Sequence, residues 1–317
     1  MEKRFDVAAL GELLIDFTES GLSEQGNPIL EANPGGAPCN VLAMLKKLGK
    51  ECAFIGKVGC DRFGYELKEV VEEAGICTDG LLFDQDARTT LAFVKTAPNG
   101  DRSFSFYRNP GADMMLTEQE LPLDIIKNTR VFHFGTLSMT HPGVREATKK
   151  AVAAAKEAGA LISFDPNLRP MLWDDQEEMR EQVLYGLSVC DILKIADNEI
   201  EFLTGSQEKE GIEQLKKLAP GCKIMNVTFG ANGSLNVSAE GTVFVPAVTL
   251  GGTIETTGAG DTFCACVINY VLDHGTDLTQ DQRKEMLQFA NAAAYIVTTK
   301  KGAIRSMPEP AEVEAIL

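Results

Sequence analysis

The sequence predicts an α/β protein with a mostly parallel central sheet that is flanked by helices. Three observations point to this class. Short apolar runs alternate with amphipathic stretches along most of the 317 residues, as in repeated strand–helix–strand units. Glycine follows amphipathic stretches at Gly75 and Gly159, where it favours a helix end. No apolar run approaches the ~20 residues that a membrane-spanning helix requires.

The expected elements follow in chain order from the spacing of the apolar residues. The first part predicts strands at 5–10 and 53–58 and helices at 40–48 and 63–74. The later part alternates more regularly. It predicts strands at 131–134, 161–164, 192–195 and 223–228, and helices at 142–158, 177–190, 212–218, 261–274 and 283–299. This order favours parallel strands with helices on both faces of the sheet.

Two segments break the alternation. Residues 90–96 and 103–107 are strand-like runs around an Asn-Gly pair at 99–100, which is a strong hairpin signal. Residues 13–33 also lack helical periodicity. We expect the excursions at about 13–33 and 88–112 to leave the main sheet and pair into a small β-sheet lid over the functional site. The whole of 1–317 is expected to form one domain with this lid.

Composition disfavours several partners. The chain has 46 acidic and 30 basic residues, a net charge of −16, and such a surface repels nucleic acids and anionic lipids. We therefore expect no nucleic acid and no membrane as partners. Eight scattered cysteines show no CxxC spacing, and the N-terminus has no signal-peptide core. Reduced thiols and a cytoplasmic location are the expectation.

The clearest chemical motif is TTGAGDTF at residues 256–263, where small residues lead into an apolar helix. Glycines allow consecutive N–H groups to point one way, and the helix adds its positive N-terminal end. Together they form an anion hole suited to a phosphate. On its own, such a short pattern is more often a glycine-rich turn with Asp261 as a helix cap.

Three further segments have polar or glycine residues where a ligand could bind. PGGAPCN at 34–40 exposes backbone at two glycines and places Asn40 at a helix start. FDPNLR at 164–169 follows a strand, and open α/β sheets bind ligands at the carboxyl ends of their strands. FYRNPGAD at 106–113 ends the expected hairpin. Each segment could instead be a turn, a cap or a charged surface loop.

At these four segments the chain resembles the ribokinase-like (PfkB) sugar kinases, over about residues 5–308. The GG…N region at 35–40, continuing through 56–64, and TTGAGD at 256–261 match two signatures of that family, in the family's order. FYRNP at 106–110 and DPNLR at 165–169 are similar to fructokinases. The resemblance implies a ribokinase-like fold and ATP-dependent phosphorylation of a sugar hydroxyl, with D-fructose converted to fructose 6-phosphate as the first expectation.

The resemblance also implies roles for individual residues. Asp261 is the expected catalytic base, and the N–H groups of Gly258, Ala259 and Gly260 are expected to stabilise the transferring phosphoryl group. The sugar is expected to bind at Asp16, Gly35, Gly36, Asn40, Tyr107, Arg108 and Arg169. ATP is expected to bind at Lys194, Thr228, Gly230, Gly233, Gly260 and Asn291.

Mg²⁺ is the cofactor that the resemblance implies, with ATP as co-substrate. Glu199 matches a family carboxylate that acts on Mg²⁺, commonly through water, although an exposed acid at a helix start is the simpler alternative. Ala196 stands where the family often has Asn or Ser. A K⁺ site is implied at Glu255, where the family commonly has Asp, and the longer carboxylate could reach the cation or displace it.

Other functions remain open. The main alternative is a 2-keto-3-deoxygluconate kinase of the same fold, because Arg108 and Arg169 could clamp the carboxylate of that sugar. Tyr107 is the only local hydroxyl, which favours fructose. A non-catalytic binding or scaffold member is a remote alternative, and a dinucleotide oxidoreductase is disfavoured because no GxGxxG follows the first strand. A homodimer through the lid is expected from its exposed sheet edge.

Overall fold

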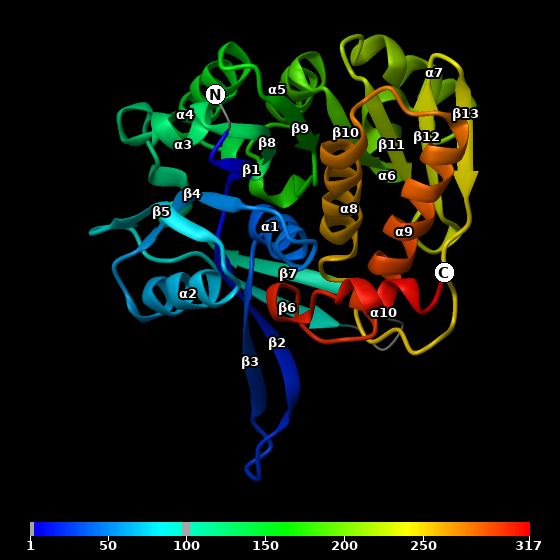
Figure 1. Ribbon diagram of the computed structural model, residues 1–317. Helices are drawn as coiled ribbons and strands as arrows, with labels where there is room; N and C mark the ends of the chain where they lie inside the picture. The colour runs from blue at the N-terminus through cyan, green and yellow to red at the C-terminus, as the bar shows by residue number, and fades with distance from the viewer. Residues whose placement is uncertain (1–2, 97–101) are drawn as a thin grey trace.

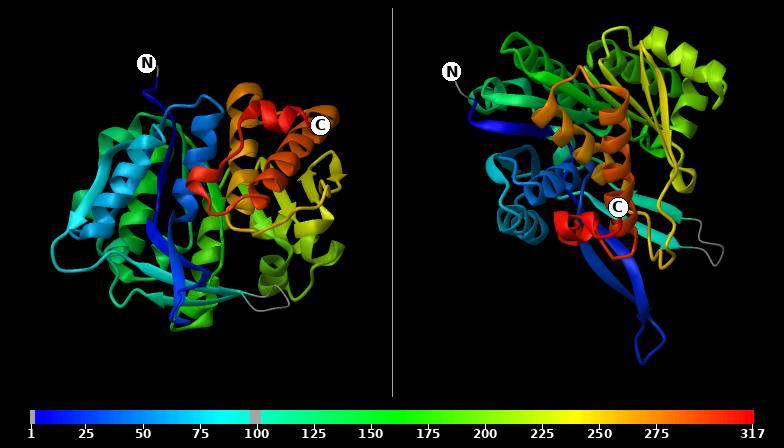
Figure 2. Two further views of the ribbon diagram at one scale, coloured as in Figure 1. Left: turned by 90° about the horizontal axis from the view of Figure 1, so that it is seen from below. Right: turned by 45° about the vertical axis from the view of Figure 1, so that its right-hand side comes forward.

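The computed structural model of the chain describes residues 3–96 and 102–317. The elements form two sheets, a large one between layers of helices and a smaller one beside it (Figures 1 and 2). The Asn-Gly turn expected at 99–100 lies outside the described residues. Within them, no helix is both long and apolar enough to cross a membrane.

The large sheet has nine strands in the order β13-β12-β11-β10-β9-β8-β1-β4-β5. Neighbours from β5 to β11 pair parallel, and β12 pairs antiparallel with both β11 and β13. The mostly parallel sheet is therefore confirmed. Its strands are β1 (Phe5–Leu10), β4 (Cys52–Gly59), β5 (Cys77–Asp84), β8 (Thr129–Gly135), β9 (Leu161–Asp165), β10 (Ile192–Ala196), β11 (Ile224–Thr228), β12 (Ser234–Ser238) and β13 (Gly241–Val245).

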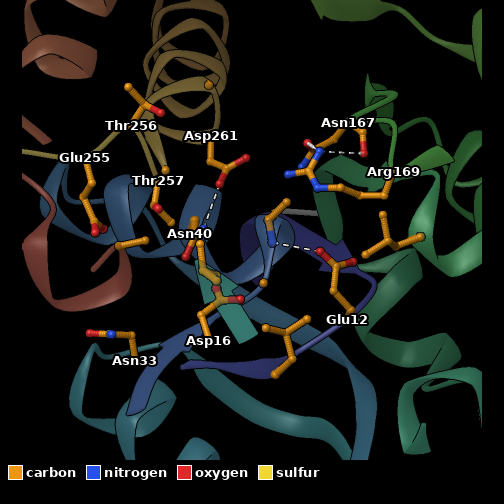
Figure 3. A pocket seen from close by; sticks show the side chains of 18 of the residues that line it. Glu12, Asp16, Asn33, Asn40, Asn167, Arg169, Glu255, Thr256, Thr257 and Asp261 are labelled. Carbon is orange, nitrogen blue, oxygen red and sulfur yellow. Dashed lines mark hydrogen bonds between the residues drawn. The ribbon is translucent and has the colours of Figure 1, made fainter. Parts of the chain in front are cut away.

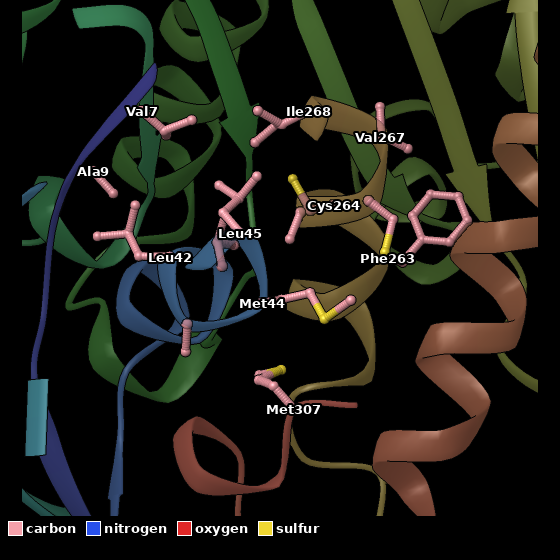
Figure 4. Close-up of a cluster of buried hydrophobic side chains, with 14 of the residues drawn as sticks. Val7, Ala9, Leu42, Met44, Leu45, Phe263, Cys264, Val267, Ile268 and Met307 are labelled. Atoms are coloured by element: carbon pink, nitrogen blue, oxygen red, sulfur yellow. The ribbon is translucent and has the colours of Figure 1, made fainter. Parts of the chain in front are cut away.

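Helices cover both faces of this sheet, as β1 illustrates. Val7 and Ala9 pack with one group of helices, whereas Ala8 and Leu10 face the other, because successive side chains of a strand point to opposite faces. The first group is α1 (Ala37–Lys47), α2 (Arg62–Glu73), α8 (Ala259–His274) and α9 (Gln280–Thr298), with part of its core in Figure 4. The second is α3 (Leu123–Lys127), α4 (Pro142–Glu157), α5 (Gln176–Val189), α6 (Asp197–Thr204) and α7 (Lys209–Leu218).

Helix starts differ from the expectations by a few residues. The helix expected at 40–48 begins at Ala37 and the one expected at 261–274 begins at Ala259. The first turn of a helix tolerates residues that cannot donate an N–H, so Pro38 does not delay the start of α1. A capping box between Thr279 and Gln282 starts α9 at Gln280. A short helix, α10 (Pro310–Glu314), lies near the C-terminus.

The second sheet pairs the two predicted excursions. Its order is β3 (Pro28–Gly35), β2 (Leu14–Leu22), β6 (Leu91–Thr96) and β7 (Arg102–Tyr107). Phe17 of β2 stacks on Phe93 of β6 and meets Phe63 of α2 edge-on, which joins this sheet to the large one's helices. The β2–β3 hairpin projects from the body of the protein in Figure 1 and in the right view of Figure 2.

Candidate active site

A cavity of about 550 Å³ lies where the second sheet meets the carboxyl ends of β9, β10 and β11. The N-terminal ends of α1 and α8 complete its wall. The second sheet contributes side chains from all four of its strands, among them Asp16, Asn33 and Phe106. Figure 3 shows carboxylate, amide and guanidinium groups converging on this space from both sides. Such convergence of polar groups on one cavity is typical of a ligand site.

The glycine-rich turn forms the start of α8. Gly258 is the N-cap residue and has a φ of 78°, a left-handed conformation that glycine adopts without steric cost. Gly258 and Gly260 both line the cavity. A Cβ on Gly260 would lie 3.1 Å from the Lys194 ammonium nitrogen, so this lysine packs directly against the turn. Ala259 belongs to the same helix start, although its side chain does not line the cavity. The arrangement offers N–H groups and a positive charge to an anion.

Asp261 lies one residue further along, in the first turn of α8, and is buried. Asn40 of α1 donates a hydrogen bond from Nδ2 to Asp261 Oδ2 at 2.7 Å. Burial raises the pKa of Asp261, while this hydrogen bond and the charges of Lys194 and Arg169 oppose the rise. A carboxylate with a raised pKa beside an anion hole is suited to accept a proton from a hydroxyl. Asn40 Oδ1 is buried with no hydrogen-bond partner in the described part of the chain.

The paired glycines allow three segments to approach closely. Gly36 has a φ of 130°, and a Cβ there would lie 2.4 Å from the Glu12 carbonyl oxygen. A Cβ on Gly35 would lie 2.7 Å from Asp16 Oδ2. Gly36, Asp16 and Asn40 line the cavity, whereas Gly35 supports Asp16 from behind. A side chain on Gly36 would push the backbone of Glu12 and Leu13 away from the start of α1, and one on Gly35 would displace the Asp16 carboxylate.

Glu12 is a buried cavity residue that the sequence did not suggest. Its Oε1 accepts a hydrogen bond from the Ala37 N–H at 2.9 Å. Burial raises the pKa of Glu12 to about 7. Glu12 follows β1 at the carboxyl edge of the sheet, where open α/β sheets bind their ligands. Its position after a strand is therefore the signal that could have identified it. Asn33 and Asn167 also line the cavity without having been candidates.

Lys194 and Asp165 form a buried ion pair under the α8 turn. The Lys194 Nζ lies 3.1 Å from Asp165 Oδ1, and each side chain is less than a tenth exposed. Burial lowers the pKa of Lys194, but the charges of Asp165, Glu199 and Asp261 outweigh it, so the pKa is raised. The lysine is therefore a fixed positive charge that lines the cavity.

Arg169 reaches the cavity from the turn after β9. Its Nη1 donates to Asn167 Oδ1 at 2.8 Å and to the Leu168 carbonyl at 2.9 Å. Both Arg169 and Asn167 line the cavity. In Figure 3 the guanidinium extends from this turn toward Asp261.

Arg108 and Tyr107 were expected at the sugar site but, like Gly35, they do not line this cavity. Arg108 is buried, pairs with Asp113 at 2.7 Å, and donates to Thr140 and to the Leu137 carbonyl. Tyr107 is 68% exposed. Phe106 lines the cavity instead, because neighbouring residues of β7 point to opposite faces of the strand. The carboxylate of Asp113, close in sequence, holds Arg108 at the root of the second sheet.

The expected ATP residues fall into two groups. Thr228 and Gly230, at the end of β11, line the cavity with Lys194 and Gly260. Gly233 and Asn291 lie behind them. A Cβ on Gly233 would lie 2.3 Å from the Val245 carbonyl, and Asn291 accepts from Ser234 and donates to that same carbonyl. These two residues therefore support the strand ends that carry the first group.

Glu199 is buried, and each of its carboxylate oxygens accepts a backbone N–H at 2.8 Å, one from Leu168 and one from Ala196. No cluster of three or more metal-ligating side chains occurs among residues 3–96 and 102–317. Mg²⁺ does not need such a cluster, because it keeps several waters and binds substrate phosphates. Glu199 itself does not line the cavity, whereas its neighbours Asp197 and Asn198 do, so the residues present fit an Mg²⁺ ion that is held mainly by phosphates and water. Glu255 lines the cavity and accepts from the Gly302 N–H at 2.8 Å.

Comparison with known proteins agrees with this geometry. Residues 4–310 match the sequence profile described as pfkB family carbohydrate kinase. Fructokinase-1 of Zea mays is 43% identical over 97% of this chain and 96% of that protein. A fructokinase from Xylella fastidiosa, solved with bound ATP, superposes with a TM-score of 0.89 and 30% identity over 98% of both chains. A fructokinase from Vibrio cholerae, solved with fructose, ADP and calcium, superposes with a TM-score of 0.87 and 29% identity over 99% of both chains. The glycine-rich turn, its buried aspartate and this full-length similarity together place the chain in the pfkB family of carbohydrate kinases.

Proposed function

We propose that the protein is an ATP-dependent fructokinase, which transfers the γ-phosphoryl group of ATP to D-fructose and produces fructose 6-phosphate. The observation that carries the proposal is the buried Asp261 carboxylate beside the α8 turn, in a cavity shared with Asp16, Asn40 and Arg169. The names of the full-length relatives support fructose as the acceptor.

The sugar side of the reaction is assigned to Asp16, Gly36, Asn40 and Arg169. The Asp16 carboxylate accepts hydrogen bonds from sugar hydroxyls, and the Asn40 Oδ1, buried without a partner among the described residues, accepts another. Asp261 takes the proton of the attacking hydroxyl, while Asn40 Nδ2 holds its other oxygen in place. Fixing the hydroxyl against the base supplies positioning, on which phosphoryl transfer chiefly depends.

The phosphate side is assigned to the start of α8 and to Lys194. The N–H groups of Gly258, Ala259 and Gly260 and the Lys194 ammonium face the transferring group and stabilise its developing charge. Thr228 and Gly230 contact the nucleotide, and Gly233 and Asn291 support them. Glu199 is proposed to act through water on an Mg²⁺ ion, which would supply positive charge to the phosphates when bound. A K⁺ ion near Glu255 is part of the proposal and is tested by replacing KCl with a tetramethylammonium salt.

The second sheet is proposed to act as a lid and as a dimer contact. It supplies Asp16, Asn33 and Phe106 to the cavity, so its closure excludes water from the phosphoryl group. Leu22, Ile29 and Leu30 are exposed on the β2–β3 hairpin, and apolar strands of this kind pair readily with a second copy. Sedimentation of the protein with and without Leu30→Glu tests the dimer. A single domain over 1–317 and a cytoplasmic location complete the proposal.

The 2-keto-3-deoxygluconate alternative loses its main support. That alternative required Arg108 and Arg169 to clamp a carboxylate together, but Arg108 is held by Asp113, Thr140 and the Leu137 carbonyl outside the cavity. The non-catalytic alternative is disfavoured because Asp261 and the glycine turn are both placed in the cavity.

The test is Mg-ATP consumption by the purified protein with fructose, 2-keto-3-deoxygluconate, ribose, adenosine or no sugar. We expect turnover with fructose and slow hydrolysis without sugar. Turnover with the keto-deoxy acid but not with fructose would contradict the assigned substrate. Absence of turnover on the whole panel, with ATP still bound, would contradict the assigned activity.

A further inference from the structure

The turn after β9 has an unusual backbone. Asn167 has a φ of 44° and is the only non-glycine residue with a left-handed φ in the described parts of the chain. This conformation is unfavourable for residues that have a Cβ, and asparagine is one of the few that tolerate it. Such strain persists where surrounding contacts hold it, and it concentrates at functional sites. The position is on the cavity wall.

Four hydrogen bonds hold this turn. The Asn167 Oδ1, the Leu168 carbonyl and the Asn167 carbonyl accept from Arg169 Nη1, at 2.8, 2.9 and 3.4 Å. The Leu168 N–H donates to Glu199 Oε1 at 2.8 Å. The turn is thus tied at one end to its own arginine and at the other to the start of α6. All three of these Nη1 acceptors belong to the turn, which fixes the plane of the guanidinium.

Fixing an arginine has a specific benefit for binding. Arginine has many rotamers, and ordering its side chain when a ligand arrives opposes binding. A guanidinium that is already held needs less ordering when a ligand arrives, so this cost is smaller. Arg169 also lowers the pKa of Asp261 through its charge, against the larger effect of burial. The placement of Arg169 therefore affects both the proposed sugar binding and the pKa of Asp261.

We propose that Asn167 is a positioning residue, whose left-handed backbone and amide oxygen together hold Arg169 over the sugar site. The proposal rests on the proposed function for the identity of the sugar. It assigns no contact between Asn167 and the substrate. Loss of the amide should therefore weaken sugar binding through Arg169 and leave ATP binding nearly unchanged.

Three substitutions separate the backbone from the amide. Asn167→Gly keeps the left-handed backbone and removes the amide. Asn167→Ala removes the amide and disfavours the backbone. Asn167→Asp keeps an acceptor for Arg169 and tolerates the backbone. The matched control is Asn128→Ala, because Asn128 is an exposed asparagine whose amide bonds a nearby carbonyl at the end of α3.

We expect Asn167→Gly and Asn167→Ala to raise the KM for fructose about tenfold, the effect of losing one good hydrogen bond at the site. The KM for ATP should stay within about twofold, and Asn167→Asp should recover most of the loss. Asn128→Ala should match the wild type. A wild-type KM for fructose in Asn167→Gly would overturn the role of the amide. Equal increases in both KM values would show a structural role only.

A double-mutant cycle tests whether Asn167 acts through Arg169. If it does, Asn167→Gly combined with Arg169→Met should bind sugar no worse than Arg169→Met alone. Additive losses would overturn the proposal. All variants are measured with whichever panel sugar the wild type phosphorylates, so a wrong sugar assignment does not affect this result. The same cycle on thermal unfolding needs no substrate, and the absence of coupling there would show that the two side chains do not interact.

Discussion

Two buried cations in this protein look alike in isolation and differ in what surrounds them. Lys194 pairs with Asp165 at 3.1 Å, and Arg108 pairs with Asp113 at 2.7 Å. Lys194 lines the cavity beside the glycine turn, and its ammonium, which has three donors, pairs with one carboxylate among residues 3–96 and 102–317. Arg108 lies at the root of the second sheet, and its Nε, Nη1 and Nη2 all have protein acceptors. A buried cation that protein acceptors saturate joins elements, whereas one that faces a cavity can bind a ligand.

The largest effect is expected at Asp261, the carboxylate on the Lys194 side of this comparison. Asp261→Asn removes the base but keeps an oxygen for the Asn40 hydrogen bond. We expect kcat to fall by about 10³-fold or more, with little change in melting temperature. Steady-state kinetics and thermal unfolding measure the two. Turnover near the wild-type value would show that another group takes the proton.

Arg108→Met should reduce stability much more than activity. It leaves the buried Asp113 without its cation, and removing one member of a buried pair costs about 3–5 kcal/mol of unfolding free energy. Urea denaturation measures this loss. The protein that remains folded should keep kcat within a few-fold, because Arg108 does not line the cavity. A loss of kcat without a loss of stability would mean that Arg108 acts on the substrates.

Lys194→Met is the matched change at the other pair, with the opposite expected readout. Burial has already raised the pKa of Asp165 to about 7, so this carboxyl can become neutral when its partner is removed. The stability cost should therefore be smaller than for Arg108→Met. Activity should fall by about 10²-fold, as when a donor to the transferring group is removed. A stability loss as large as that of Arg108→Met would show that the two pairs play the same role.

Glu12 contrasts with the carboxylates of these two ion pairs, because it is buried at the cavity with no ion pair among the described residues. Its folded-state pKa of about 7 lies above the ordinary value of 4.5. The folded state therefore binds more protons between these values, and stability falls as pH rises through that range. Glu12→Gln keeps an acceptor for the Ala37 N–H but cannot titrate. Between pH 5 and pH 7.5 the variant should therefore lose about 1–3 kcal/mol less unfolding free energy than the wild type. Denaturation at pH 5 and pH 7.5 measures it. Parallel pH profiles of wild type and variant would contradict the assignment.

Much of the fold could be predicted because it depends on local periodicity. The strands and helices of the large sheet follow from apolar spacing, and the second sheet follows from segments that lack helical spacing. The strands β5, β12 and β13 were not predicted, and neither was the eight-residue α6. The β12–β13 ladder lies at an edge of the sheet and mixes apolar with polar residues, so its sequence lacks the continuous apolar run of a buried parallel strand.

The positions of the glycines in the candidate site could be predicted, because backbone geometry constrains them. The glycines at 35–36 and 258–260 are required by close approach or by left-handed backbone, and such requirements are visible in sequence. The roles of long polar side chains were harder to assign. Arg108 and Arg169 occur in similar polar segments of the sequence. Arg108 is held away from the cavity by its contacts with Asp113 and with Thr140, and the contact with Thr140 cannot be read from the local sequence. Glu12 was missed because its burial depends on α1 and the second sheet together.

The hydrogen bond between Asn40 and Asp261 joins residues 221 positions apart. Asn40 appears early in synthesis and Asp261 late, so only a fragment that reaches residue 261 of the 317 contains both groups. A nascent chain that stops before this residue therefore cannot form the Asn40–Asp261 contact in the cavity wall. Contacts of such long range also slow folding. If Asp261 is the base, as we propose, turnover requires α1 and α8 to have packed together, so the onset of turnover during refolding reports that packing step.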